Sequence, residues 1–202
     1  RIVIVFQDYQ LLTDRNVFMN LYYVMKATGW KREQEIRERI DRVLGLVELG
    51  SKSYKMPFEL SGGQKRRVAI AGVMAMNPKV LILDEPASGL DPKGREQILG
   101  LIREYHEQMK NTVLLVSHSM EDIAKNVSKI LVMNESKLFC YDDTVKVFHR
   151  SEELVSMGLA VPQITRVINR LKAMGIDIKD DVYTVGYAKK VILEMLEQKK
   201  NK

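Results

Sequence analysis

The sequence predicts an α/β protein built around a mainly parallel sheet, with a small α+β module at its C-terminal end. Short apolar runs of strand length alternate with longer stretches of helical periodicity, which is the order of elements in parallel sheets. Polar side chains suited to chemistry follow several of these runs directly, and ligands bind at the edge where parallel strands end. The 202 residues are 46% hydrophobic and 29% charged, as is typical of a globular protein.

The first strand is predicted at Ile2 to Phe6, a β-branched apolar run that ends at Gln7. Residues 10 to 58 read as mostly helical. Within them, acid-to-base pairs four residues apart, such as Glu33 and Arg37, are typical of a solvated helix face.

A central strand follows the next helix. That helix is predicted from about Gly63 to Met76, because Ser61 is a preferred N-cap residue and Asn77-Pro78 ends the helical pattern. Val80 to Leu83 is entirely apolar, which predicts a strand covered on both faces. Pro92 then begins a helix that reaches about Lys110.

The remaining elements are shorter. Thr112 to Val116 is predicted as a second buried strand, and a short helix as Glu121 to Asn126. A hairpin is expected from Ile130 to Tyr141, turning at Glu135-Ser136. After about residue 150 no further polar motifs follow strands, so the sequence predicts one domain over 1–150 and a small module over 151–202. In that module we expect a helix after Pro162, a short strand at Val182 to Val185, and a last helix from Tyr187 to Gln198.

Bulk properties exclude some classes of protein. The net charge of +6 is compatible with nucleic acid, anionic lipid or nucleotide phosphates, and it selects none of them. The single cysteine, Cys140, excludes a disulfide framework and indicates a reducing compartment. Because no run approaches the roughly 20 apolar residues that span a bilayer, a role at a membrane requires a partner.

Two adjacent acids, Asp84 and Glu85, end the central strand. Mg²⁺ keeps most of its waters, so Asp84 suits an ion held through water beside nucleotide phosphates. Glu85 lies one residue further on and could orient or deprotonate the water that attacks a γ-phosphate. The alternative is that the pair simply ends a strand before Pro86.

The LSGGQ segment precedes the helix that begins near Gly63. Gly62 and Gly63 allow a backbone to approach an anion closely, and a helix N-terminus offers free N–H groups with a partial positive charge. Ser61 adds a hydroxyl donor. This pattern predicts a cap that faces phosphate; an ordinary N-cap with two loop glycines is the alternative.

Two further polar residues follow. Asp91 closes an SGLD segment directly before Pro92, which a plain turn would also explain. His118 lies at the end of the following strand, where an imidazole can contact a γ-phosphate and hold the attacking water. A structural histidine is the alternative.

Taken in this order, the motifs resemble those of the ATP-binding cassette (ABC) ATPases over about residues 1 to 150. The resemblance implies a P-loop NTPase-like fold with a helical signature subdomain at about residues 10 to 76. It implies that Gln7 is the Q-loop glutamine, which senses Mg²⁺ and the transmembrane partner, and that the signature consists of Ser61, Gly62, Gly63 and Gln64. By the same resemblance, Asp84 is the Walker B aspartate and Glu85 the catalytic glutamate. Asp91 is then the D-loop aspartate and His118 the switch histidine.

The resemblance also implies cofactors and partners. Two cassettes of the family, identical or paralogous, dimerise head to tail around two ATP molecules with Mg²⁺, so the signature of one chain faces the nucleotide held by the other. Integral membrane subunits hold such cassettes peripherally at the cytoplasmic face of the cell membrane. No nucleic-acid partner is expected, because residues 10 to 58 are too few for the long coiled coils of DNA-repair cassettes.

Within the family, two subgroups share the resemblance. From about Val47 onward the chain resembles the energy-coupling factor cassettes, which serve importers of vitamins, cobalt and nickel, and residues 151–202 resemble their C-terminal dimerisation module. Phe6 to Met25 resembles instead the cassettes of cell-division and lipoprotein-release type. Either subgroup is an interpretation that the sequence leaves open.

A phosphate-binding P-loop, GxxxxGK[ST], should precede Gln7 in such a protein, and the sequence contains none. Residues 45–53 come close, but Ser51 separates Gly50 from Lys52 and the segment follows a helix. We therefore expect an N-terminally truncated cassette whose 202 residues alone bind ATP poorly. A non-hydrolysing or chimeric cassette that acts as a dimerisation module is the further alternative.

Overall fold

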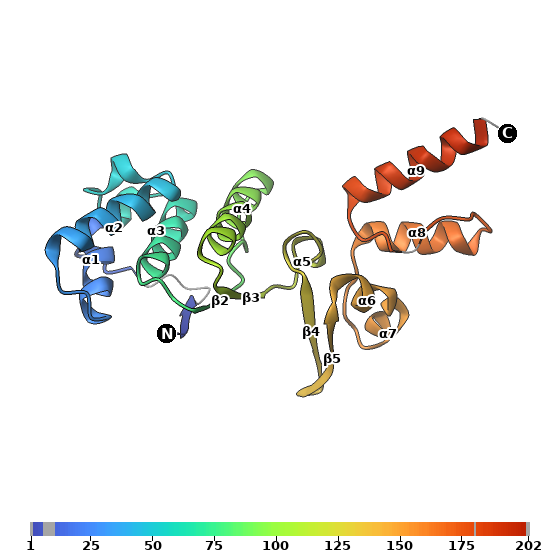
Figure 1. Cartoon of the computed structure of the whole chain (residues 1–202), viewed down its shortest axis with the longest axis horizontal. Helices are drawn as coiled ribbons and strands as arrows, with labels where there is room; N and C mark the ends of the chain where they lie inside the picture. The colour runs from blue at the N-terminus through green and yellow to red at the C-terminus, as the bar shows by residue number, and fades with distance from the viewer. Residues whose placement is uncertain (1, 6–10, 180, 201–202) are drawn as a thin grey trace. The chain divides into compact units, whose positions relative to one another are not determined.

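The computed structural model describes residues 2–5, 11–179 and 181–200, with side chains described up to residue 197 (Figure 1). The chain divides into two compact units, Arg1–Val116 and Ser117–Lys202. Each unit is described by itself.

The first unit contains a three-stranded sheet of β1 (Ile2–Val5), β2 (Val80–Asp84) and β3 (Thr112–Val116) in the order β1-β2-β3. Both pairings are parallel, and Ile2 and Thr112 flank Val80 in the register. The predicted parallel sheet is therefore confirmed.

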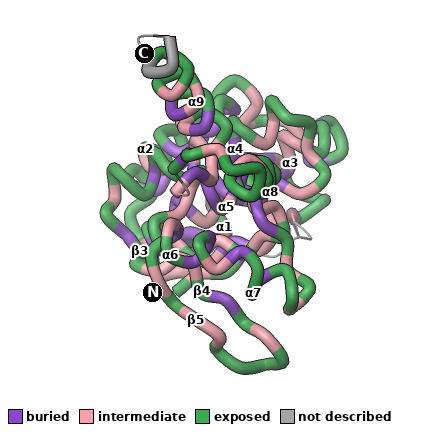
Figure 2. Tube along the Cα trace, turned by 90° about the vertical axis from the view of Figure 1, so that its right-hand side faces the viewer, coloured by how far each residue is buried: buried purple, intermediate pink, exposed green. Residues whose placement is uncertain are grey.

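Helices fill the chain between β1 and β2, as the sequence predicts. They are α1 (Val17–Ala27), α2 (Glu33–Leu46) and α3 (Gly62–Ala75), with two short 3-10 helices, Gly50–Lys52 and Pro57–Glu59. The three α-helices lie side by side (Figure 1), and their apolar faces join one core that includes Leu21, Ile40 and Ile70. Along these helices buried stretches alternate with exposed ones (Figure 2), as expected for amphipathic helices.

Helix α4 (Pro92–Met109) connects β2 to β3 and buries Ile98, Ile102 and Tyr105 in the same core. It begins at Pro92, as predicted, and ends with Lys110 in a left-handed conformation, φ 51°. Helix α3 thus precedes β2, the strand that ends at Asp84, and α4 follows it.

The prediction that β3 is a buried strand is wrong for the described part of the first unit, whereas the second face of β2, with Val80 and Ile82, is half-buried. Leu81, Leu83, Val113 and Leu115 point toward the helical core, but Leu114 and Val116 are 49% and 51% exposed. On β1, Ile2 is 69% exposed. An all-apolar strand can be buried on both faces. Whether other elements actually cover both faces depends on the tertiary packing, which the strand sequence does not determine.

The second unit begins with α5 (Met120–Asn126) and an antiparallel hairpin of β4 (Lys129–Asn134) and β5 (Lys137–Asp143). The hairpin is confirmed, and its turn residues Glu135 and Ser136 have φ of 48° and 61°, the left-handed geometry of a tight hairpin turn. Helices α6 (Thr144–His149) and α7 (Ser151–Ser156), which the sequence reading did not include, pack on it through Val147, Phe148 and Leu154.

The unit ends with α8 (Gln163–Ala173) and α9 (Val185–Lys200) around a core of Ile168, Val182 and Val191. The strand predicted at Val182 to Val185 is wrong. Val182 enters this core, and the Thr184 hydroxyl accepts a 3.4 Å hydrogen bond from the Tyr187 N–H group, so the β-branched run leads into a helix instead.

The apolar cluster formed by α5, the hairpin, α6 and α7 extends to Val161. It crosses residue 150, and the predicted domain boundary there stays a prediction. Among the residues that the structure describes, none of the helices combines the length and apolar character that crossing a bilayer requires.

Candidate functional site

The LSGGQ segment forms the N-terminus of α3 through a reciprocal cap. The Ser61 hydroxyl accepts a 3.3 Å hydrogen bond from the Gln64 N–H group, and the Gln64 side-chain oxygen accepts one of 3.1 Å from the Ser61 N–H group. This capping box fixes the direction in which α3 begins. The N–H groups of Gly62 and Gly63 belong to the first turn, where a helix provides no carbonyl partner.

Packing within the described part of the chain does not require the two glycines. A Cβ atom on Gly62 would meet no atom within 4 Å, and one on Gly63 would meet only Leu90 Cδ2, at 3.6 Å. Neither has a positive φ. Close approach of a group from outside the chain supplies a physical reason for glycine that the fold does not.

The first turn of α3 borders a hollow of about 350 Å³. Ser61, Gly63 and Gln64 line it together with Asp91, so the structure brings two of the predicted motifs to one place. Basic and acidic side chains both contribute to its walls, and the remaining lining includes Glu48, Lys52, Arg67, Leu90, Gly94 and Ile98.

Asp91 caps α4. Its Oδ1 accepts a 2.8 Å hydrogen bond from the Gly94 N–H group, and the side chain is exposed at the rim of the hollow. A Cβ on Gly94 would lie 2.7 Å from Asp91 Oδ1, so a side chain at this position would require the Asp91 carboxylate to shift. The SGLD segment therefore has a defined local structure in which the aspartate carboxylate remains accessible.

Asp84 and Glu85 lie at the carboxyl end of β2, both half-buried. Asp84 pairs with Val116 in the sheet. The Glu85 N–H group donates a 3.0 Å hydrogen bond to the Val116 carbonyl, and the Glu85 carbonyl accepts one of 3.1 Å from the Ser88 N–H group. Glu85 has φ 48°. This left-handed conformation costs a residue with a side chain on the order of 1 kcal/mol, and such residues cluster at functional sites.

Two arginines that the sequence reading missed hold α3 against its neighbours. Arg67 donates to Glu48 Oε2 at 2.8 Å and to Gln97 Oε1 at 2.5 Å. Arg66, with 7% of its surface exposed, donates to the carbonyl of Ser88. The basic run KRR directly after LSGGQ was the available signal.

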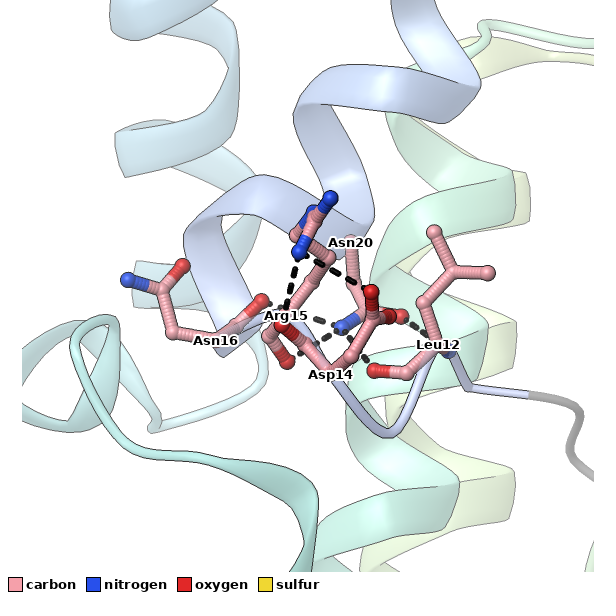
Figure 3. A network of polar contacts seen from close by, with 5 residues as sticks. All are labelled: Leu12, Asp14, Arg15, Asn16 and Asn20. Carbon is pink, nitrogen blue, oxygen red and sulfur yellow. Dashed lines mark hydrogen bonds and ion pairs between the residues drawn. The ribbon is translucent and has the colours of Figure 1, made fainter.

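A buried asparagine, also missed, organises the loop before α1 (Figure 3). Asn20 is 5% exposed; its Oδ1 accepts a 2.7 Å hydrogen bond from the Leu12 N–H group. Its amide nitrogen lies within 3.1 Å of the carbonyl oxygens of Leu12, Arg15 and Asn16. An amide on the apolar face of a helix was the signal that pointed to it.

The placement of two predicted site residues relative to this group is not described. Gln7 lies outside the described residues. His118 is exposed and belongs to the second unit, two residues after the Val116 whose carbonyl binds Glu85. Their roles stay predictions.

The donor set at the end of β2 fits Mg²⁺. Mg²⁺ is usually bound by one or two carboxylates with phosphate and water oxygens rather than by a cage of protein ligands. The half-exposed Asp84 carboxylate offers such a contact. Within the described part of the chain, no three His, Cys, Asp or Glu side chains form a group that could hold a metal ion.

Comparisons with known proteins agree on one family. The family model described as ABC transporter matches residues 1–88. The energy-coupling factor transporter ATP-binding protein EcfA2 of Clostridium tetani is 50% identical over 169 residues, covering 83% of this chain and 59% of the relative. EcfA2 of Caldanaerobacter subterraneus is 45% identical over 201 residues, covering 99% of this chain and 70% of the relative.

A solved structure shares the fold. It is the structure of cbiO1 from Clostridium perfringens, described as part of the ABC transporter complex cbiONQ. It matches with a TM-score of 0.67 and 35% identity over 83% of this chain and 67% of that one.

Proposed function

Because the chain belongs to the ABC transporter family, among the energy-coupling factor ATP-binding proteins, we propose that it acts as an ATP-hydrolysing subunit that drives the import of a micronutrient. The observation that carries the proposal is the first turn of α3, where Gly62 and Gly63 present backbone N–H groups and no contact among the described residues explains their lack of side chains. The relatives align over 97 to 99% of the chain, including the segment Phe6 to Met25. This supports the importer over the cell-division or lipoprotein-release alternative.

In the proposed mechanism, the start of α3 binds the γ-phosphate of an ATP molecule held by a second cassette. The N–H groups of Gly62 and Gly63 donate to phosphate oxygens, and the partial positive charge of the helix end favours the anion. Ser61 and Gln64 hold that turn in place through their reciprocal cap. The hollow beside them, which Asp91 also lines, is the side on which the partner approaches.

At the other nucleotide, Glu85 acts as the general base. It orients the attacking water and accepts its proton as the water oxygen bonds to the γ-phosphorus, while the bond to the bridging oxygen breaks and ADP leaves. Its backbone is fixed by the hydrogen bonds to Val116 and Ser88, which keeps the carboxylate at the strand end. Asp84 and Gln7 would hold Mg²⁺, largely through water, and a bound ion would neutralise phosphate charge. His118 would contact the γ-phosphate.

The partners are a second cassette, identical or paralogous, and integral membrane subunits that keep the protein at the membrane surface. Their support is the family: the solved relative is described as part of a transporter complex. The module over 151–202 would contribute to pairing the two cassettes.

The test is phosphate release by the complete protein assembled with its partners. Glu85→Gln is expected to retain ATP binding and to lower turnover by about 100-fold or more, the usual contribution of a positioned base. Glu107→Gln, an exposed glutamate on α4, is the matched control and should turn over as wild type does. Equal turnover in Glu85→Gln and wild type would reject the role of Glu85.

A further inference from the structure

The helix that carries the glycine turn is joined to the turn that carries the proposed base. Arg66 follows Gly63 by three residues, so both lie on one face of α3. On that face the Cβ position of Gly63 lies 3.6 Å from Leu90 Cδ2, and the Arg66 guanidinium donates from Nη1 to the Ser88 carbonyl. The segment 88–91 thus lies beside the start of α3, and the charged hydrogen bond from Arg66 to Ser88 joins the two.

The same segment leads back to Glu85. The Ser88 N–H group donates to the Glu85 carbonyl at 3.1 Å, and the Glu85 N–H group donates to Val116 at 3.0 Å. A continuous series of hydrogen bonds therefore runs from Arg66 through Ser88 to Glu85. Glu85 has φ 48°, and a movement of the turn would have to change that angle.

Arg66 is an unexpected residue for this position if its function is packing alone. Its side chain is almost fully buried, and burial lowers the pKa of its guanidinium, which shows that the surroundings oppose the charge. An apolar side chain would fill the same space without that desolvation cost.

We infer that Arg66 is a positioning residue that couples the two nucleotide sites of the assembled protein. The inference rests on the proposed function, in which α3 of a chain serves one nucleotide and Glu85 of the same chain serves the other. When α3 closes on its phosphate, Arg66 moves with it and sets the position of the 85–88 turn. Glu85 then adopts its productive position at one site only when the signature turn is engaged at the other.

The test compares Arg66→Met, which keeps the volume and removes the donor, with Arg66→Lys, which keeps the charge and a donor. In the complete assembled protein, Arg66→Met is expected to lower kcat by about 10- to 100-fold, the usual effect of a misplaced catalytic group. KM should remain within about twofold, because Arg66 is not placed against the nucleotide that its own chain binds. Arg42→Met, an exposed arginine of α2, is the matched control.

Cooperativity supplies the readout that simple destabilisation would not change. Two coupled sites give a Hill coefficient for ATP above 1, and Arg66→Met should bring it toward 1, with recovery in Arg66→Lys. If Arg66→Met fails to fold, Arg66→Gln replaces it with the same expected result. Hydrolysis in wild type with an unchanged kcat and Hill coefficient in the variant would overturn this inference alone. An assembled wild-type protein that releases no phosphate would overturn the proposed function, and the inference with it.

Discussion

The guanidinium of Arg39 on α2 donates a 2.6 Å hydrogen bond from Nη2 to the carbonyl oxygen of Met74 at the end of α3. Its Nε reaches the Ala75 carbonyl at 3.4 Å, and the Tyr105 hydroxyl of α4 also donates to Met74, at 3.3 Å. The last carbonyls of a helix lack partners within the helix. Here side chains from two other helices supply them, so both ends of α3 have side-chain hydrogen-bond partners.

Removing this contact should destabilise the chain. Arg39→Met removes the charged donor from the carbonyls of the buried residues Met74 and Ala75 and is expected to lower the free energy of unfolding by about 1–3 kcal/mol. Urea unfolding of the variant beside Arg42→Met, which alters an exposed arginine of the same helix, measures the difference. A loss no larger than that of Arg42→Met would contradict a capping role for Arg39.

The Asn20 network predicts a stability loss with a chemical signature. Asn20→Leu leaves the Leu12 N–H group and three carbonyls without their buried partner and should cost about 3 kcal/mol. Asn20→Asp should cost more at neutral pH, because a carboxylate cannot donate to those carbonyls and repels them. Equilibrium unfolding gives both values, and hydrogen exchange at the Leu12 amide locates the effect. An aspartate variant more stable than the leucine one would refute this account.

The glycines of α3 and α4 offer a matched pair that separates stability from activity. Neither Gly62 nor Gly100 would bring a new Cβ within 4 Å of another atom. Both alanine variants should therefore fold, and Gly100→Ala should gain up to about 1 kcal/mol because alanine is the better helix former. Only Gly62→Ala should lose phosphate release in the assembled protein, by about tenfold or more, since its methyl group would meet the phosphate. Parallel losses in both variants would remove the ligand argument for Gly62.

An acid-sensitive contact joins α1 to α2. Glu33 accepts hydrogen bonds from Lys26 Nζ at 3.1 Å and from the Tyr22 hydroxyl at 2.9 Å, and these contacts lower the pKa of the Glu33 carboxyl. A lowered folded-state pKa means that the stabilisation is present above the ordinary value, about 4.3, and is lost as the pH falls through the folded-state value. The advantage of wild type over Glu33→Gln should therefore shrink below about pH 4. Unfolding curves from pH 7 to 3 measure it, and a constant difference would exclude the contact.

Local pattern predicted the elements whose causes are local. The start of α3 at Ser61, the proline-led start of α4 and the Glu135-Ser136 turn each depend on a few neighbouring residues, and the structure has them where the sequence indicates. The exposure of one face of β3 and the start of a helix at Val185 depend on which elements pack nearby. A single sequence does not show directly which distant elements pack together.

The same division holds for the candidate site. Ser61, Gly63 and Asp91 could be named from motifs, and their shared hollow follows from the packing of α3 against the segment before α4. Arg66 and Asn20 could not be assigned partners, because Ser88 lies 22 residues from Arg66 and the Asn20 contacts need the loop before α1 to fold back. Chemistry at a strand end is readable from residue types, whereas the contacts that hold it are long-range.

The pairing of Ile2 with Val80 sets an order in which the first unit can assemble. Joining these strands closes a loop that contains α1, α2 and α3. The chain loses the conformational entropy of this closure before the hydrogen bonds and packing of the sheet can offset it. The three helices contact one another over shorter separations and can collapse first. During refolding, we therefore expect the apolar strand Ile2–Val5 to pair after the helices have packed, and until then its open edge can pair with another chain.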